Sequence, residues 1–171
     1  MRQPRQRAAI DTNFFIESAG ELPEVGSSRA PYSEPCMEML NLAGHKYECV
    51  IPLIVPGELL AFLIEKVGSL DSRRQLLSLF KQWLIDGRFR VVKMDHPIEN
   101  VLARLEGLRL NDYQDRMIVA CSLAAECDIL FTTDGKIKGE EAAISKLSRD
   151  LNRKALHVAH PGDSDFRQWV G

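Results

Sequence analysis

The amino-acid sequence predicts an α/β fold of three layers, α/β/α, with a central parallel sheet, and three observations support this class. Short apolar segments of strand-like composition alternate along the chain with longer segments whose apolar residues recur at helical spacing. Such alternation is typical of strand–helix–strand units, which pair their strands in parallel through right-handed crossovers. The length of 171 residues and the hydrophobic fraction of 45% suit one core of this kind. We therefore expect a single domain over residues 1–171.

The first half of the chain is expected to contribute two strands. Residues 8–10 form an apolar strand, and the polar residues directly after it cap the start of a helix. A stretch rich in Gly, Pro, Ser and Glu, from Gly20 to Pro35, predicts a loop insertion that gates a pocket, holds a partner or is disordered. The elements expected after it are a helix over 34–43, a strand over 47–51, a helix with Pro56 in its first turn and a helix over 71–85.

The second half continues the alternation. One of its helices is apolar nearly all round, from Met117 to Ala125, and is therefore expected to be buried. The elements expected here are a strand over 89–94, a helix over 97–108, the apolar helix ending by Asp128, a strand over 129–132, a turn at Asp134 and Gly135, a polar helix over 140–152 and a last strand over 155–158.

The charge balance gives little sign of a partner. The chain has 22 Lys and Arg residues against 24 Asp and Glu residues, a formal net charge of -2. A strongly basic nucleic-acid-binding protein is therefore excluded. A site built from several carboxylates would itself make the count negative, and divalent cations bound there would restore a local positive field.

Cysteine and histidine spacing argues against a zinc site. The cysteines Cys36, Cys49, Cys121 and Cys127 lack CxxC spacing, so we expect free, buried thiols. His157 and His160 form an HxxH pair, but a strand between them would place the two rings on opposite faces. The sequence shows no secretory leader and no segment of membrane-spanning length, so we expect a cytoplasmic protein.

Carboxylates follow two of the predicted strands. Asp11 comes directly after the first strand, and Asp134 follows the strand over 129–132. Because parallel strands end at one edge of the sheet, where α/β proteins bind their ligands, we expect these side chains to converge. Glu58 and Asp115, each near the start of a helix, are candidates to join them.

Each of these acids alone also has a structural explanation. The alternatives are a helix cap for Asp11, a first-turn carboxylate for Glu58, the third position behind a cap at 111 or 112 for Asp115, and an Asp-Gly turn for Asp134. As a group they have a different meaning, because all of them adjoin strongly apolar segments. When like charges lie within a few ångströms of one another, their repulsion costs roughly several kcal/mol even at an effective dielectric constant near 20. Such a cluster is therefore protonated or binds a cation.

The chemistry of such a cluster indicates an enzyme that acts on phosphodiesters. Mg²⁺ prefers oxygen ligands and takes one or two carboxylates together with waters and a substrate phosphate. A water activated by such an ion can attack phosphorus in line with the leaving oxygen, without a nucleophile from the protein.

Four segments carry a resemblance to a known family. In chain order they are Ala9-Ile10-Asp11-Thr12-Asn13, Pro56-Gly57-Glu58-Leu59-Leu60, Asp115-Arg116-Met117-Ile118-Val119-Ala120 and Leu130-Phe131-Thr132-Thr133-Asp134. In order and spacing the chain resembles the PIN domains from about Ala8 to the strand near Val158, and the last two segments are the most specific. Many members of that family are VapC-type ribonucleases.

The resemblance implies a fold and a metal site. The fold is the three-layer α/β/α arrangement already expected, and the site hydrolyses single-stranded or structured RNA with Mg²⁺ or Mn²⁺ as cofactor. The implied catalytic and metal-binding residues are Asp11, Glu58, Asp115 and Asp134.

Three further residues are expected to support this site. Thr132 matches the family's Ser or Thr two residues before the last acid, and Asn13 matches the polar residue that follows the first. Asp112, one helical turn before Asp115, either faces the pocket or caps the helix.

RNA binding would require positive charge beside the acids. The candidate substrate-binding residues are Arg116, Lys136 and Lys138, with Arg73 and Arg74 on a predicted surface helix. Solvated surface charge is the alternative for all of them. Because many relatives are toxins of toxin–antitoxin pairs, the resemblance also implies an antitoxin protein and a homodimer as partners.

Three other functions would each require particular residues. A PIN fold that binds RNA or protein without cutting usually lacks one or more of the acids, and all four are present here. A structure-specific DNA nuclease stays open, since no motif reports recognition of the 2′-hydroxyl. A haloacid-dehalogenase-like phosphatase would need a second aspartate where this chain has Asn13. The gap from Asp11 to Glu58 is wider than in compact toxins, which weakens the toxin assignment more than the fold.

Overall fold

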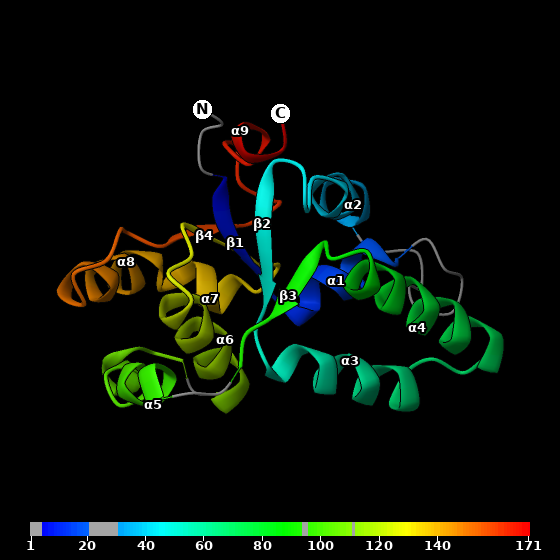
Figure 1. Ribbon diagram of the computed structural model, residues 1–171, viewed down its shortest axis with the longest axis horizontal. Coiled ribbons are helices and arrows are strands. Elements are labelled where there is room, and N and C mark those ends of the chain that lie inside the picture. The colour runs from blue at the N-terminus through cyan, green and yellow to red at the C-terminus, as the bar shows by residue number, and fades with distance from the viewer. Residues whose placement is uncertain (1–4, 21–30, 94–95, 111) are drawn as a thin grey trace.

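A five-stranded sheet forms the centre of the computed structural model (Figure 1), which describes residues 5–20, 31–93, 96–110 and 112–171. The strands are β1 (Gln6–Ile10), β2 (Tyr47–Ile51), β3 (Phe89–Val91), β4 (Ile129–Phe131) and β5 (His157–Ala159). Their order is β3-β2-β1-β4-β5, and every neighbouring pair is parallel. The prediction of a parallel α/β sheet is therefore confirmed.

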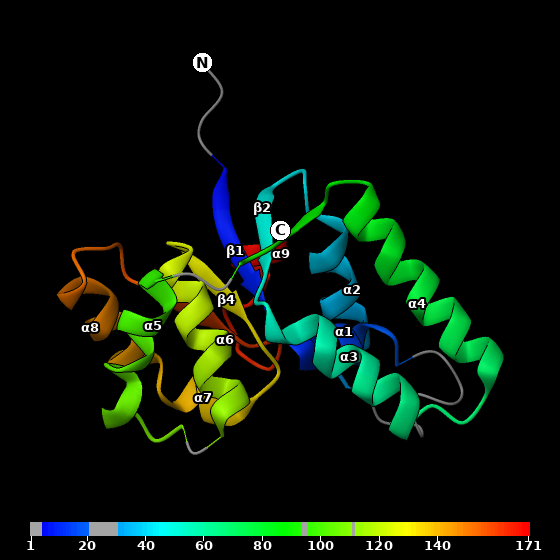
Figure 2. The same cartoon turned by 60° about the horizontal axis from the view of Figure 1, so that its bottom comes forward.

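Helices cover both faces of the sheet, which gives three layers (Figures 1 and 2). The helices of one face are α1 (Thr12–Ser18), α2 (Ser33–Asn41), α3 (Ile54–Glu65) and α4 (Leu70–Ile85). Those of the other face are α5 (His96–Leu102), the 3₁₀ turn η1 (Leu105–Gly107), α6 (Tyr113–Ala124), α7 (Gly135–Gly139) and α8 (Glu141–Asp150). A last short helix, α9 (Arg167–Val170), packs against α2. The two faces follow from the chain's path, because β1 to β3 step one way across the sheet and β4 and β5 the other.

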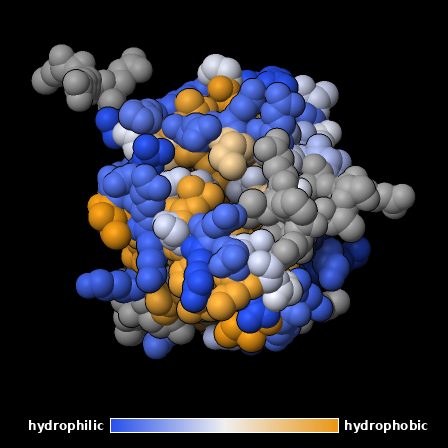
Figure 3. Space-filling view, turned by 90° about the vertical axis from the view of Figure 1, so that its right-hand side faces the viewer, coloured by the Kyte–Doolittle hydropathy of each residue, from blue (hydrophilic) through white to orange (hydrophobic). Residues whose placement is uncertain are grey.

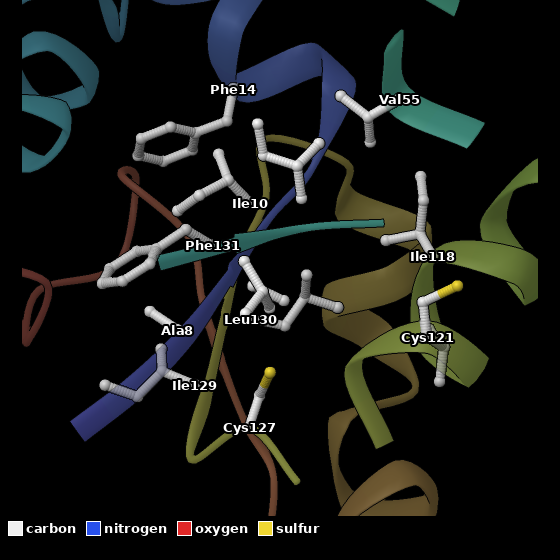
Figure 4. Packing of buried hydrophobic residues seen from close by; sticks show 14 of the residues in the cluster. Ala8, Ile10, Phe14, Val55, Ile118, Cys121, Cys127, Ile129, Leu130 and Phe131 are labelled. Atoms are coloured by element: carbon white, nitrogen blue, oxygen red, sulfur yellow. The ribbon is translucent and has the colours of Figure 1, made fainter. Parts of the chain in front are cut away.

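The core lies between β1, β4 and the helices on either side (Figure 4). Ile10, Leu130 and Phe131 are fully buried, as is expected of strands covered on both faces. Helix α6 is buried from Met117 to Leu123, so its all-round apolar composition was a correct sign of burial. All four cysteines are free and buried, as predicted.

The neighbouring strands β1 and β4 mark the point where the strand order reverses. The connection after β1 runs over one face of the sheet and the connection after β4 over the other, so the chain diverges beyond their carboxyl ends. Open α/β sheets bind ligands in the crevice at such a point. Asp11 directly follows β1, and Thr132 directly follows β4.

Several predicted boundaries differ from the structure. The helix expected over 97–108 ends at Leu102 and continues as the separate 3₁₀ turn, and the strand expected over 89–94 ends at Val91. The predicted turn at Asp134 and Gly135 is the start of helix α7, because the Asp134 carboxylate accepts a hydrogen bond from the backbone N–H of Lys136.

Most of the loop expected between Gly20 and Pro35 falls on 21–30, outside the described residues, while α2 begins at Ser33. In the described part of the chain, none of the helices is both long and apolar enough to span a membrane.

Candidate functional site

The carboxyl end of β1 buries a carboxylate. Asp11 is 1% exposed, and its backbone N–H donates to the Phe131 carbonyl at 3.0 Å, which continues the pairing of β1 with β4 by one residue. Its side chain makes no capping hydrogen bond to helix α1. The carboxylate instead accepts a hydrogen bond of 2.6 Å from the Thr132 hydroxyl across the strand ends. Asp11 therefore occupies the N-cap position of α1, but its carboxylate does not cap the helix.

Thr132 links two of the predicted acids. Its side chain is fully buried, and its oxygen also accepts a hydrogen bond of 2.9 Å from the backbone N–H of Asp134. A single hydroxyl therefore orients the Asp11 carboxylate and fixes the backbone at the start of α7. The Asp134 carboxylate serves as the N-cap of that helix.

Helices α3 and α6 bring the other two acids to the same edge of the sheet (Figure 2). Glu58 lies in α3, and its carboxylate accepts a hydrogen bond from the Thr12 hydroxyl at the start of α1. Asp115 lies in the first turn of α6, whose cap is Asp112 through a 2.9 Å bond from the backbone N–H of Gln114.

These side chains share one hollow with a volume of about 320 Å³. Its lining includes all four predicted acids together with Asn13, Asp112 and Lys136. Six acidic side chains line it in total against two lysines, and the complete lining is Asp11, Thr12, Asn13, Ile16, Glu58, Ala61, Phe62, Glu65, Lys66, Asp112, Gln114, Asp115, Ile118, Asp134 and Lys136. We refer to it as the acidic pocket.

The pocket raises the proton affinity of its carboxylates. Burial raises the pKa of Asp11 from 3.8 to about 7, with a further rise from Glu58, although the hydrogen bond from Thr132 opposes the shift. Burial, followed by the charges of Asp134 and Asp112, raises the pKa of Asp115 to about 6. Burial also raises the pKa of Glu58. Like charges held out of water in this way favour a bound cation.

The donor set of the pocket suits a hard divalent ion. The candidate ligands are carboxylate oxygens, the donor type that Mg²⁺ and Mn²⁺ prefer. Among the described residues, however, no three Asp, Glu, His or Cys side chains are placed to ligate one ion. Mg²⁺ sites usually keep several waters and use only one or two carboxylates, so the pocket fits such an ion by its chemistry.

Comparison with known proteins decides the family. Residues 8–139 match the family described as PIN domain, which covers more than half of the chain and includes all four acids. The chain belongs to the PIN domain family. No curated protein and no solved structure matches it. PIN domains are generally nucleases, so the family match supports a nuclease-type fold.

Four of the five basic residues predicted to bind substrate lie outside the acidic pocket of this PIN domain, namely Arg73, Arg74, Arg116 and Lys138. The Arg116 guanidinium donates to the Leu110 carbonyl at 2.5 Å. The Lys138 ammonium contacts Glu141 at 2.7 Å and Asp163 at 2.8 Å and donates to the Val158 carbonyl. Both side chains therefore hold elements of the fold together, and Lys136 is the predicted base that does line the pocket.

The pocket also contains residues that the sequence analysis missed. Glu65 and Lys66 line it from the far end of α3. One face of α3 contains Glu58, Ala61 and Glu65, which are three and seven residues apart. The seven-residue interval from Glu58 could therefore have identified Glu65 as a residue of the same pocket. The bond from Thr12 to Glu58 joins two helices and could not be inferred from spacing.

The HxxH pair makes separate contacts. The His157 ring lies 3.9 Å from the Glu141 carboxylate, whereas the His160 ring contacts the Thr133 carbonyl at 3.1 Å. Neither histidine lines the acidic pocket.

An apolar groove adjoins the pocket between α1, α3 and α4. Ile16 and Phe62 line both, so the two hollows meet along one side of α3. Figure 3, which looks at the molecule from the right-hand side of Figure 1, shows hydrophobic side chains gathered between charged ones. Leu60 in the groove is 49% exposed.

Proposed function

We propose that this PIN domain is a metal-dependent endoribonuclease that hydrolyses RNA phosphodiester bonds at the acidic pocket. The observation that carries the proposal is the convergence of Asp11, Glu58, Asp115 and Asp134 on one hollow at the carboxyl edge of the sheet. These residues come from four separate segments of the chain, and ordinary capping roles do not require them to meet.

The proposed cofactor is Mg²⁺ or Mn²⁺, bound directly by one or two of these four carboxylates and through water by the others, with substrate phosphate as a further ligand. When bound, the ion would activate a water for in-line attack on phosphorus and stabilise charge on the attacking and leaving oxygens. The raised pKa values of Asp11 and Asp115 support this assignment, because they reflect burial first and neighbouring negative charge second, and a bound cation would offset both.

The remaining side chains of the pocket have supporting roles in the proposal. Thr132 orients the Asp11 carboxylate, and Thr12 does the same for Glu58. Asn13, which is exposed at the mouth of the pocket, offers an amide to a phosphate or sugar oxygen. Lys66 and Lys136 supply positive charge for the phosphates on either side of the cleaved bond.

RNA is proposed over DNA because the four segments resemble RNA-cleaving members of the family. A role as the toxin of a toxin–antitoxin pair, with an antitoxin protein and a homodimer as partners, rests on the same resemblance and stays a prediction.

The test compares the wild type with Asp11→Asn on a mixed RNA pool in Mg²⁺, Mn²⁺ or EDTA, with mapping of the cleaved ends. Asp150→Asn is the matched control, because Asp150 is an exposed aspartate at the end of α8 and outside the pocket. We expect metal-dependent cleavage by the wild type and the control and none by Asp11→Asn. Equal cleavage by all three proteins would refute the proposed site.

A further inference from the structure

Two hollows lie away from the acidic pocket, at the other edge of the sheet. They are found near Arg7 and Asp128, which lie at the amino ends of β1 and β4. The first, of about 360 Å³, is lined by Arg5, Arg7, Glu48, Glu126, Cys127, Asp128, Asn152, Arg153 and Lys154. The second, of about 630 Å³, runs along β3 and is lined by Arg7, Arg90, Val91, Val92, Lys93, Ala124, Ala125 and Glu126. Arg7 and Glu126 line both, so the hollows adjoin, and we call them together the basic cleft.

Backbone carbonyls position the arginines of the cleft without neutralising them. Arg5 donates to the Gly44 carbonyl, Arg7 donates to the Ala125 carbonyl at 2.7 Å, and Arg153 donates to the Leu123 carbonyl. A carbonyl is uncharged, so each of these guanidinium groups keeps its positive charge while its place on the surface is fixed.

Acidic side chains neutralise only part of this charge. Glu48 is shared between two arginines, at 3.3 Å from Arg7 and 3.5 Å from Arg90. The Nε of Arg7 is buried and, among the described residues, has no hydrogen-bond partner. Lys154 is 88% exposed at 3.5 Å from Asp128, so that pair is strongly solvated. The cleft contains six basic side chains and three acidic ones.

We infer that the basic cleft binds the phosphate backbone of RNA outside the bond that is cut. The inference rests on the proposed function, because it assigns a second contact region to the substrate of the acidic pocket. The pocket itself has six acids and two lysines, so a polyanion gains little attraction there beyond the bound metal. The cleft provides a local excess of positive charge that can attract the RNA, although the formal net charge of the whole chain is -2.

Arginine favours phosphate as the ligand of the cleft. A planar guanidinium can donate two parallel hydrogen bonds to one phosphate, and it loses its bound water more easily than an ammonium does. Four of the six basic side chains of the cleft are arginines. Arg7 lies in β1 and Asp11 follows its last residue, so the two are about 13 Å apart along the extended backbone. One RNA chain that passes around the protein surface would therefore span a distance of at least this size to contact both regions.

The test measures binding of a labelled single-stranded RNA in EDTA, so that cleavage and metal-mediated contacts are suppressed. The variant carries Arg90→Ala, Lys93→Ala and Lys154→Ala, three exposed positions of the cleft. The matched control carries Lys81→Ala, Arg104→Ala and Lys146→Ala, three exposed positions outside it that remove the same charge. Thermal unfolding checks that both proteins are folded.

We expect the cleft variant to bind RNA roughly 10- to 100-fold more weakly than the wild type near 0.1 M salt, and its log–log salt slope to be smaller by about 2. The control should lose less than the cleft variant and keep most of the slope. Equal losses in the two variants would overturn the inference. Displacement of the RNA by polyglutamate at equal charge concentration would also overturn it, since the cleft would then fit an acidic protein.

Failure of this inference is distinguishable from failure of the proposed activity. If the wild type binds RNA through these residues yet cuts none, the nuclease proposal fails and the cleft assignment stands. If the wild type cuts RNA while the cleft variant binds RNA as tightly as the wild type, the nuclease stands and the cleft assignment fails.

Discussion

The two ends of the same strands differ sharply in charge. At its carboxyl end β1 is followed by Asp11, which is buried and joined to β4 through Thr132. Near its amino end β1 carries Arg7, which is partly exposed and shares Glu48 with Arg90. One short strand thus links a pocket of carboxylates to a cleft of guanidinium groups.

The difference teaches how a chain with nearly balanced charge can still bind a polyanion. Carboxylates at the carboxyl ends meet because parallel strands all end at that edge, and a bound cation would relieve their repulsion. Basic residues at the other end would need no cation to attract phosphate. The sum over the sequence hides this separation, so net charge alone does not decide whether a chain can bind a polyanion.

The largest expected effect is on cleavage, from Asp115→Ala. Loss of a metal-binding carboxylate is expected to raise the activation free energy by about 4 kcal/mol, which slows cleavage roughly 1000-fold. The fold should persist, because Asp115 is half-buried in the first turn of α6, which Asp112 already caps. Single-turnover cleavage and thermal unfolding measure the two quantities, and cleavage at the wild-type rate would contradict the site.

The pH dependence of stability is expected to differ between the two ends of β1. Because burial raises the pKa of Asp11 from 3.8 to about 7, the folded metal-free protein favours the protonated acid. This contribution to stability is complete below about pH 4 and is lost as the pH rises through 7, by roughly 4 kcal/mol.

Denaturant unfolding of the metal-free protein from pH 4 to pH 8 measures this loss. Asp11→Asn should make the dependence shallower, since Asn does not titrate while Asp115 and Glu58 still do, and the cleft variant should leave it unchanged. An equally steep dependence in Asp11→Asn would show that another group is responsible.

Removal of the Thr132 hydroxyl should have a smaller effect. Thr132→Val takes away the hydrogen bond that orients Asp11, and partners of metal ligands typically contribute 10- to 100-fold in affinity or activity, so we expect a loss of about that size. Thr132→Ser keeps the hydroxyl and should restore Mn²⁺ affinity. If Thr132→Ser and Thr132→Val are equally impaired, the methyl packing matters and the hydrogen bond does not.

The smallest effect is expected in the basic cleft. Glu48→Gln removes the carboxylate that Arg7 and Arg90 share, so RNA should bind up to about fivefold more tightly near 0.1 M salt. Cleavage of a short oligonucleotide should not change. A weaker affinity of Glu48→Gln for long RNA would mean that the ion pairs are needed to position the arginines.

The sequence was sufficient for the fold and for the four acids named in advance, although it missed Glu65 and Lys66. Apolar strands followed by Asp11 and Asp134 predicted both the parallel sheet and the edge at which these side chains meet. Local patterns were sufficient because a few neighbouring residues are enough to show both the apolar pattern of a strand and the polar residues that end it.

Glu58 and Asp115 were candidates because each was expected near a helix start, and the family resemblance then assigned them to the site. The first-turn explanation for Glu58 is wrong, since α3 begins at Ile54, whereas Asp115 does lie in the first turn of α6.

Features that depend on distant partners were missed. Lys138 was expected at the substrate, but Asp163, far along the chain, holds its ammonium. The basic cleft combines Arg7, Arg90 and Lys154 from three distant segments, and no interval in the sequence relates them. Contacts of this kind are fixed by tertiary packing.

Calorimetric titration of Mn²⁺ into the metal-free protein at pH 6 tests the central claim most directly. The account predicts saturable binding with release of about one to two protons, because at that pH Asp11 is mostly protonated and Asp115 is about half protonated, and both must ionise to bind the ion. Asp11→Asn and Asp115→Ala should bind at least about 10-fold more weakly, and Asp150→Asn should bind as the wild type does. Absence of binding, or equal binding by all four proteins, would contradict the account.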